Sequence, residues 1–232
     1  MAETAPRELD GDPSSRKRFL RGLGGAGALG AFGLVVTACG EDQEEAQRGD
    51  ARSGGAQDTD AGDKGGNDLE IVNFALTLEY LEADFYDQAL TSGLLSGDLR
   101  DLAATFGKTE QAHVEALEAV ASQLGEPVDP PRTDFSAFLK GEETLLAALA
   151  DVENLGAAAY LGAAPAIQDR ELLAAALSIH SVEARHAAAL NERIGRSFDG
   201  ETALAGSMPH GAFASPMSMQ EVRDQIQPFL AS

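Results

Sequence analysis

The 232-residue sequence contains one cysteine, no tryptophan and fewer than half as many basic as acidic residues. The single Cys39 excludes an intrachain disulfide, and a thiolate-held iron–sulfur cluster is excluded for the same reason. The 17 basic and 38 acidic residues give a net charge of −21. Nucleic acid is therefore not expected as a partner, because phosphate binding requires a basic surface. Abundant alanine, leucine and glutamate, with few β-branched residues, favour an all-α fold.

Long apolar runs are also scarce. Residues 22–38 form a run of 17 residues with six glycines, which is short and weakly apolar for a membrane span, although a short transmembrane anchor remains the alternative. The run follows Ser15-Arg-Lys-Arg-Phe-Leu-Arg21 and ends in Val36-Thr-Ala-Cys39. Residues 1–38 thus resemble a twin-arginine export signal with a bacterial lipoprotein cleavage site. The resemblance implies lipid on Cys39 and anchoring to the extracytoplasmic face of a membrane. Lys17 stands where the second arginine is usual, so the general secretory route stays open.

Residues 39–66 carry the cysteine and then an acidic, glycine-rich segment whose apolar side chains are no larger than alanine, which predicts a flexible linker. A helical domain is expected at residues 67–195 and an extension at 196–232. Apolar residues at steps of three and four predict the following helices: 67–91, 98–124, 142–163, 169–195 and 219–230. The expected N-caps include Asn67 or Asp68, Asp98 and Ser218.

The segment between the second and third helices is too long and too proline-rich for a tight turn. It begins at Gly125 and extends to about residue 141, which predicts an antiparallel four-helix bundle with one long crossover. In the extension, Phe198, Met208 and Phe213 are expected to pack on the bundle.

Two Glu-x-x-His motifs lie on apolar stripes. Glu110 and His113 are three residues apart in the second helix, and Glu183 and His186 are three apart in the fourth, so each pair shares a helix face. Apolar residues continue each stripe at steps of three and four on both sides, which places the pairs in the core. An unpaired carboxylate there would cost several kcal/mol, so a counter-charge is expected.

The two halves of the helical region repeat one pattern. Glu79 precedes Tyr86 by seven residues, and Glu153 precedes Tyr160 by the same interval. Each glutamate lies about 30 residues before the Glu-x-x-His motif of its half, so each half is a helical hairpin and the chain is an internal duplication. Packing the hairpins together predicts one core layer of four carboxylates and two imidazoles: Glu79, Glu110, His113, Glu153, Glu183 and His186.

The composition of this layer indicates two divalent metal ions. Two such ions neutralise the four carboxylates, and an oxygen-rich set with one imidazole per metal favours iron first and manganese second. Magnesium and calcium seldom take imidazole, and structural zinc usually takes cysteine. A buried polar network without metal is disfavoured, because no lysine or arginine lies on the four stripes.

Together with the segment from Leu78 to Tyr86, Leu-Glu-Tyr-Leu-Glu-Ala-Asp-Phe-Tyr, these motifs resemble those of exported members of the ferritin-like superfamily. The resemblance implies that Tyr86 lies beside the metals as a hydrogen-bond donor or redox-active group, with Tyr160 in the equivalent place. It also implies the ligand roles: Glu79 and Glu153 terminal, His113 and His186 as nitrogen ligands, and Glu110 and Glu183 bridging.

Two functions follow as hypotheses. The first is an oxidoreductase that uses dioxygen or peroxide, as a di-iron oxidase or ferroxidase or as a manganese catalase-like enzyme. The second is a non-catalytic envelope protein that sequesters iron or protects against stress. Assembly into a homo-oligomer stays open, whereas a closed storage shell is not expected, because the linker and the extension would crowd it.

The remaining polar residues have simpler interpretations. His180 is expected at the surface or behind the ligands, His210 is expected to be exposed, and Arg185 is expected to form an ion pair with a neighbouring helix. The other acidic residues of the first two helices are expected to be solvated: Glu82, Asp84, Asp87, Glu115 and Glu118.

Overall fold

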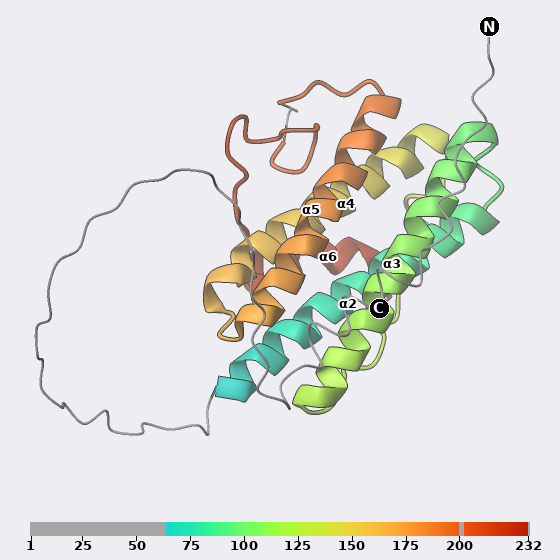
Figure 1. Ribbon diagram of the computed structural model, residues 1–232. Coiled ribbons are helices and arrows are strands. Elements are labelled where there is room, and N and C mark those ends of the chain that lie inside the picture. The colour runs from blue at the N-terminus through green and yellow to red at the C-terminus, as the bar shows by residue number, and fades with distance from the viewer. Residues whose placement is uncertain (1–63, 200–201, 232) are drawn as a thin grey trace, which may run out of the picture.

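The computed structural model describes residues 64–199 and 202–231, which are mostly helical and contain no β-strand. The all-α prediction is therefore confirmed. Four long helices form the bundle, and a short helix and two 3-10 turns complete the chain (Figure 1): α2 Lys64–Thr91, α3 Gly97–Leu124, α4 Glu142–Ala163, η1 Ala164–Ala166, α5 Arg170–Arg193, α6 Met219–Ile226 and η2 Gln227–Phe229. The predicted export signal, Cys39 and most of the predicted linker lie outside the described residues.

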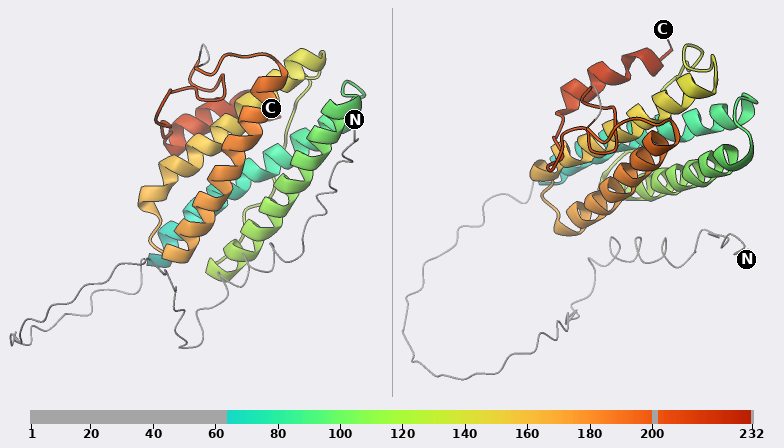
Figure 2. Two further views of the ribbon diagram at one scale, coloured as in Figure 1. Left: turned by 45° about the horizontal axis from the view of Figure 1, so that its top comes forward. Right: turned by 90° about the horizontal axis from the view of Figure 1, so that it is seen from above.

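The bundle consists of two helical hairpins. Helices α2 and α3 lie side by side, as do α4 and α5, and the two pairs pack with α2 against α4 (Figure 2). The turn between α2 and α3 contains Gly93, whose φ of 73° is in the left-handed region that favours glycine. Asp98 is not the N-cap of α3 as predicted, because the helix begins at Gly97 and Ser96 precedes it. Asp98 lies in the first turn, where its charge complements the helix dipole.

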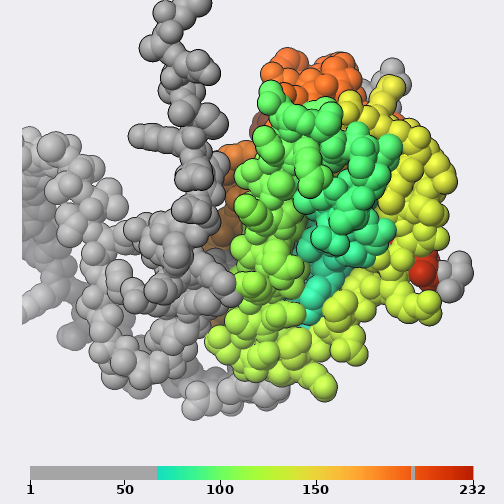
Figure 3. Space-filling view, turned by 90° about the vertical axis from the view of Figure 1, so that its right-hand side faces the viewer, coloured from blue at the N-terminus to red at the C-terminus, as the bar shows by residue number. Residues whose placement is uncertain are grey.

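The long crossover predicted between α3 and α4 is present, and it follows α2. Asn73 of α2 donates to the backbone carbonyl of Glu126 and accepts from the amide of Val128, both at 3.0 Å. Further along, the ring of Phe135 stacks on Phe85 with centroids 4.3 Å apart. In the space-filling view α2 lies between α3 and this connection (Figure 3). The crossover therefore covers the side of α2 that α3 and α4 leave open.

The start of α2 differs from the prediction. The helix begins at Lys64, so neither Asn67 nor Asp68 is its N-cap. Asp68 is buried and accepts hydrogen bonds from the backbone amides of Gln168 and Asp169, at 2.9 and 3.0 Å. This carboxylate links the first hairpin to the turn that leads into α5, where Asp169 is the N-cap.

The C-terminal segment packs on the outside of α4. Ser218 is the N-cap of α6, as predicted, and it also forms a capping box with Glu221. The helix ends at Ile226, earlier than predicted, and Phe229 follows in η2. Gly162 of α4 allows this approach, because a Cβ there would lie 1.8 Å from the carbonyl oxygen of Met217.

The prediction for the large apolar residues earlier in the extension was wrong. Phe198, Met208 and Phe213 are 68%, 51% and 85% exposed.

Among the described helices, none is both long enough and apolar enough to cross a bilayer.

Candidate metal centre

Four glutamates, one from each long helix, meet in the middle of the bundle with side chains at most 1% exposed. Helices α3 and α5 each add a histidine one turn beyond its glutamate. The structure thus brings together all six residues that the sequence singled out: Glu79, Glu110, His113, Glu153, Glu183 and His186.

The first imidazole lies among three carboxylates. His113 Nδ1 is 2.8 Å from Glu110 Oε2 and 3.2 Å from both Glu79 Oε2 and Glu183 Oε1. One ligand atom from each of these four residues lies within 4.8 Å of the others, which is close enough to surround one ion.

The second imidazole lies between two carboxylates. His186 Nδ1 is 2.8 Å from Glu110 Oε1 and 3.2 Å from Glu153 Oε2, and the ring stacks on Phe106 with centroids 3.8 Å apart. Glu110 therefore belongs to both groups, one oxygen facing each imidazole. Glu183 belongs to the group of His113 and not to that of His186, its own motif partner.

Two tyrosines connect the hairpins through these carboxylates. The Tyr86 hydroxyl on α2 donates a hydrogen bond to Glu153 on α4, and the Tyr160 hydroxyl on α4 donates one to Glu79 on α2. Both tyrosines are buried. The repeated spacing of glutamate and tyrosine in the sequence thus becomes a reciprocal pair of contacts, in which each hairpin orients the other's first carboxylate.

The carboxylates repel one another electrostatically. Burial and the neighbouring carboxylates raise the pKa of Glu153 and of Glu183 well above the usual 4.5, and burial also raises the pKa of Glu79. Burial alone would raise the pKa of Glu110 too, but hydrogen bonds with His113 and His186 lower it to about 2. Burial disfavours a charged His113, yet Glu79, Glu110 and Glu183 raise its pKa well above 6.5.

The donor set fits a pair of divalent cations. Neither oxygen of Glu183 has a hydrogen-bond partner, although Oε1 faces an imidazole nitrogen. Buried polar atoms without partners are rare in proteins, and binding of an ion is one physical reason for them. Four carboxylates and two imidazoles supply charge and ligand types that suit divalent metal ions.

Glu82 was interpreted wrongly from the sequence. It is only 2% exposed, and its Oε2 has no hydrogen-bond partner. Burial, and then the charge of Glu183, raise its pKa well above 4.5. Its position three residues after Glu79, on the same face of α2, is the signal that could have identified it. The other acidic residues predicted to be solvated are partly or fully exposed: Asp84, Asp87, Glu115 and Glu118.

The remaining polar candidates lie apart from the six residues. His180 Nδ1 is 2.8 Å from the carbonyl oxygen of Ala157, and His210 is exposed. Arg185 donates to Ser181 of its own helix at 2.8 Å, so the predicted ion pair with a neighbouring helix was wrong.

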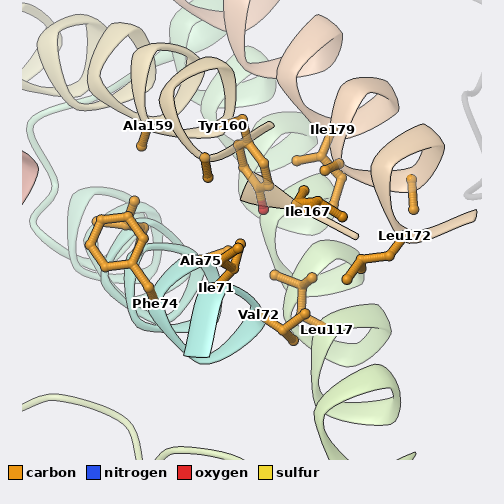
Figure 4. A pocket seen from close by; sticks show the side chains of 14 residues that line it. Ile71, Val72, Phe74, Ala75, Leu117, Ala159, Tyr160, Ile167, Leu172 and Ile179 are labelled. Carbon is orange, nitrogen blue, oxygen red and sulfur yellow. The ribbon is translucent and has the colours of Figure 1, made fainter. Parts of the chain in front are cut away.

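A small apolar cavity opens beside Tyr160. Figure 4 shows residues from all four long helices around it, with Val72, Leu117 and Ile179 among them. Its volume is about 20 Å³, which is room for one water-sized molecule. Since its lining is apolar, a small apolar molecule fits it better than water does.

The comparisons with known proteins agree with this geometry. A family model described as a ferritin-like domain matches residues 67–196, more than half of the chain. The match begins in the first turn of α2 and ends just after α5, so it contains all of the bundle except the start of α2, and all six clustered residues. The comparison with curated proteins gives no significant match. The family match, the fold and the buried cluster together show that this chain belongs to the ferritin-like domain family.

Proposed function

We propose that the cluster binds two iron or manganese ions and uses them for redox chemistry with dioxygen or peroxide. The observation that supports this most strongly is the set of four buried carboxylates around two imidazoles, with no lysine or arginine on the stripes that face them. Glu79 and His113 would hold one ion, and Glu153 and His186 the other. Glu110 would lie between the ions, because its two oxygens face different imidazoles, and Glu183 would complete the set.

Bound iron or manganese supplies one-electron redox chemistry that amino-acid side chains do not provide. The protein contributes orientation and a dry environment. Tyr86 holds Glu153, Tyr160 holds Glu79, and the stacked Phe106 fixes the plane of the His186 ring. Tyr86 also places a phenol next to a ligand carboxylate, where it serves as a hydrogen-bond donor or as a source of one electron.

The cavity beside Tyr160 supports a small substrate. It admits one molecule about the size of water, and its apolar walls suit dioxygen. A large organic substrate has no comparable space there. This agrees with reactions in which dioxygen is itself the substrate.

The decisive experiment is elemental analysis of the purified protein followed by two assays. We expect two metal ions per chain in the wild type and fewer than one in a Glu110→Gln/Glu183→Gln variant. Glu70→Gln, an exposed change on α2, is the control and should keep both ions. Dioxygen uptake with Fe(II) or peroxide decay with Mn(II) should then depend on the two bound ions. If the protein with both metal ions bound shows no activity in either assay, the non-catalytic, iron-sequestering alternative is favoured.

We also propose that the protein is exported and anchored by lipid on Cys39. The support is the sequence from Ser15 to Cys39, with its basic start, weakly apolar run and terminal cysteine. In a bacterial host, Cys39→Ser should abolish labelling by radioactive palmitate and release the protein from the membrane fraction. A variant that is still labelled would contradict the assignment.

A further inference from the structure

The internal repeat breaks at one position beside the cluster. The interval that relates Glu79 to Glu153 and Tyr86 to Tyr160 is 74 residues, and the same interval relates Glu82 to Gly156. The first hairpin therefore carries a carboxylate where the second carries no side chain. The six clustered residues and the two tyrosines recur in the second half at nearly the same spacing. The difference at Glu82 and Gly156 therefore makes the two halves of the centre unequal.

The carboxylate of Glu82 occupies the room that Gly156 leaves. A Cβ at Gly156 would lie 2.8 Å from Glu82 Oε1 and 3.0 Å from Glu183 Oε2. These two oxygens are consequently no more than 5.8 Å apart, the sum of the two distances. Any side chain at Gly156 would collide with one carboxylate or the other, so the glycine is what allows both to approach this point.

Within the described part of the chain, the Glu82 carboxylate forms no hydrogen bond and no ion pair. It is 2% exposed and its Oε2 has no hydrogen-bond partner. The charges that act on Glu82 most strongly are those of Glu183 and Glu79, both of which raise its pKa. A buried carboxylate surrounded by other carboxylates is unfavourable unless a cation is shared among them.

We propose that Glu82 is a seventh metal ligand of the centre, serving the ion held by Glu79, His113 and Glu183, so that the two metal positions differ. This rests on the proposed function, since it requires that the cluster binds metal. The position near Glu82 has one more oxygen donor and one more negative charge than the position near Glu153. It therefore binds a hard divalent ion more tightly and with a higher coordination number.

Titration calorimetry of the purified protein with Mn(II) tests this proposal. We expect two binding events in the wild type. In Glu82→Gln one event should persist, and the other should weaken about 10- to 100-fold, the range found when groups that support a metal site are removed. Gly156→Ala should weaken the same event at least as much, because its methyl group meets the flexible ends of both Glu82 and Glu183. Glu70→Gln, an exposed glutamate-to-glutamine change on α2, should leave both events unchanged.

Two further measurements separate ligation from a structural role. With Co(II) as the probe, Glu82→Gln should strengthen the visible absorption of one of two ions, because a lower coordination number gives more intense bands. The metal-free variant should unfold at the temperature of the wild type or above, since the change removes an uncompensated carboxylate. Equal weakening of both Mn(II) events together with a less stable metal-free protein would show a structural role and overturn the proposal.

The remaining outcomes are also decisive. If Glu82→Gln binds two Mn(II) ions as tightly as the wild type, Glu82 is not a ligand, and the dinuclear function is unaffected. If the wild type itself binds no Mn(II), Fe(II) or Co(II), the proposed function and the role of Glu82 fail together.

Discussion

Raising the pH from 6.5 to about 8.5 should lower the free energy of unfolding of the metal-free protein, with His113 as a main cause. Burial disfavours the charged imidazole, but Glu79, Glu110 and Glu183 raise the pKa of His113 well above its usual 6.5. A group whose pKa is higher in the folded state stabilises that state fully below the unfolded pKa. This stabilisation is lost as the pH rises through the folded pKa.

The size of the effect follows from the proton that the folded state retains. Each proton bound by the folded but not by the unfolded chain lowers the free energy of unfolding by about 1.4 kcal/mol per pH unit. His113 alone thus lowers the free energy of unfolding by up to about 2.8 kcal/mol between pH 6.5 and 8.5. Glu153 and Glu183, whose pKa values burial also raises, act with the same sign from pH 4.5 upward.

Glu110 acts with the opposite sign at low pH. Its pKa in the folded protein is about 2, because the two imidazoles outweigh the effect of burial. The stabilisation that it provides is present above pH 4.5 and is lost as the pH falls toward 2. The metal-free protein should therefore be most stable on the acid side of neutrality.

Urea denaturation followed by circular dichroism in the presence of a chelator measures these changes. The wild type should lose stability with rising pH, and His113→Gln should lose markedly less. His210→Gln, an exposed change, should behave as the wild type does. Mn(II) at about 100 times its dissociation constant should raise the free energy of unfolding by about 2.7 kcal/mol per site. At a fixed Mn(II) concentration this gain should increase with pH, because metal and protons compete for the same ligands. The reasoning would be refuted if the free energy of unfolding of the metal-free wild type did not change with pH. It would also be refuted if that free energy fell equally steeply with pH in His113→Gln and in His210→Gln.

Three other predictions concern the packing around the centre. Tyr86→Phe and Tyr160→Phe should each lower the stability of the protein by roughly 1–2 kcal/mol in thermal unfolding, since each removes a buried hydrogen bond to a carboxylate; no loss in either variant would contradict the reciprocal contacts. Phe135→Ala should cost about 3–5 kcal/mol in urea denaturation, because the ring is fully buried on Phe85; a cost below about 1 kcal/mol would mean that the crossover is not part of the core. Gly162→Ala should make the segment around Met217 sensitive to limited proteolysis, because the methyl group meets its carbonyl oxygen, whereas Gly141→Ala, with open space around it, should not.

Periodicity in the sequence was sufficient to predict the bundle and the convergence of its six polar residues. Helix α4 has the predicted bounds, and Ser218 is the predicted N-cap of α6, because both depend on local sequence. Asp68 and Asp98 were assigned as caps from the same local pattern and were wrong. For Asp68 the reason is tertiary, since its partners are two backbone amides about 100 residues away.

The spacing of Glu82 from Glu79 indicates that the two residues share a face of α2, but α2 alone does not show that this face is closed over Glu82. Tyr80, two residues before Glu82, is only partly buried and donates to Glu118, so this part of the helix carries both partly exposed and buried polar residues. Glu82 is enclosed because α4 has a glycine opposite it, and a single helix pattern does not show which residue of another helix lies opposite. Comparing the two halves of the repeat position by position would have paired Glu82 with Gly156 and indicated where the symmetry fails.

The arrangement of the donors has a consequence for folding. The group around His113 takes residues from α2, α3 and α5, and the group around His186 takes residues from α3, α4 and α5. Neither group is complete within one hairpin, and each tyrosine bonds to the carboxylate of the opposite hairpin. Metal binding would therefore join the hairpins directly. It would stabilise their association more than either hairpin itself, so removal of metal should first loosen the contact between α2 and α4, which hydrogen exchange at those helices would reveal.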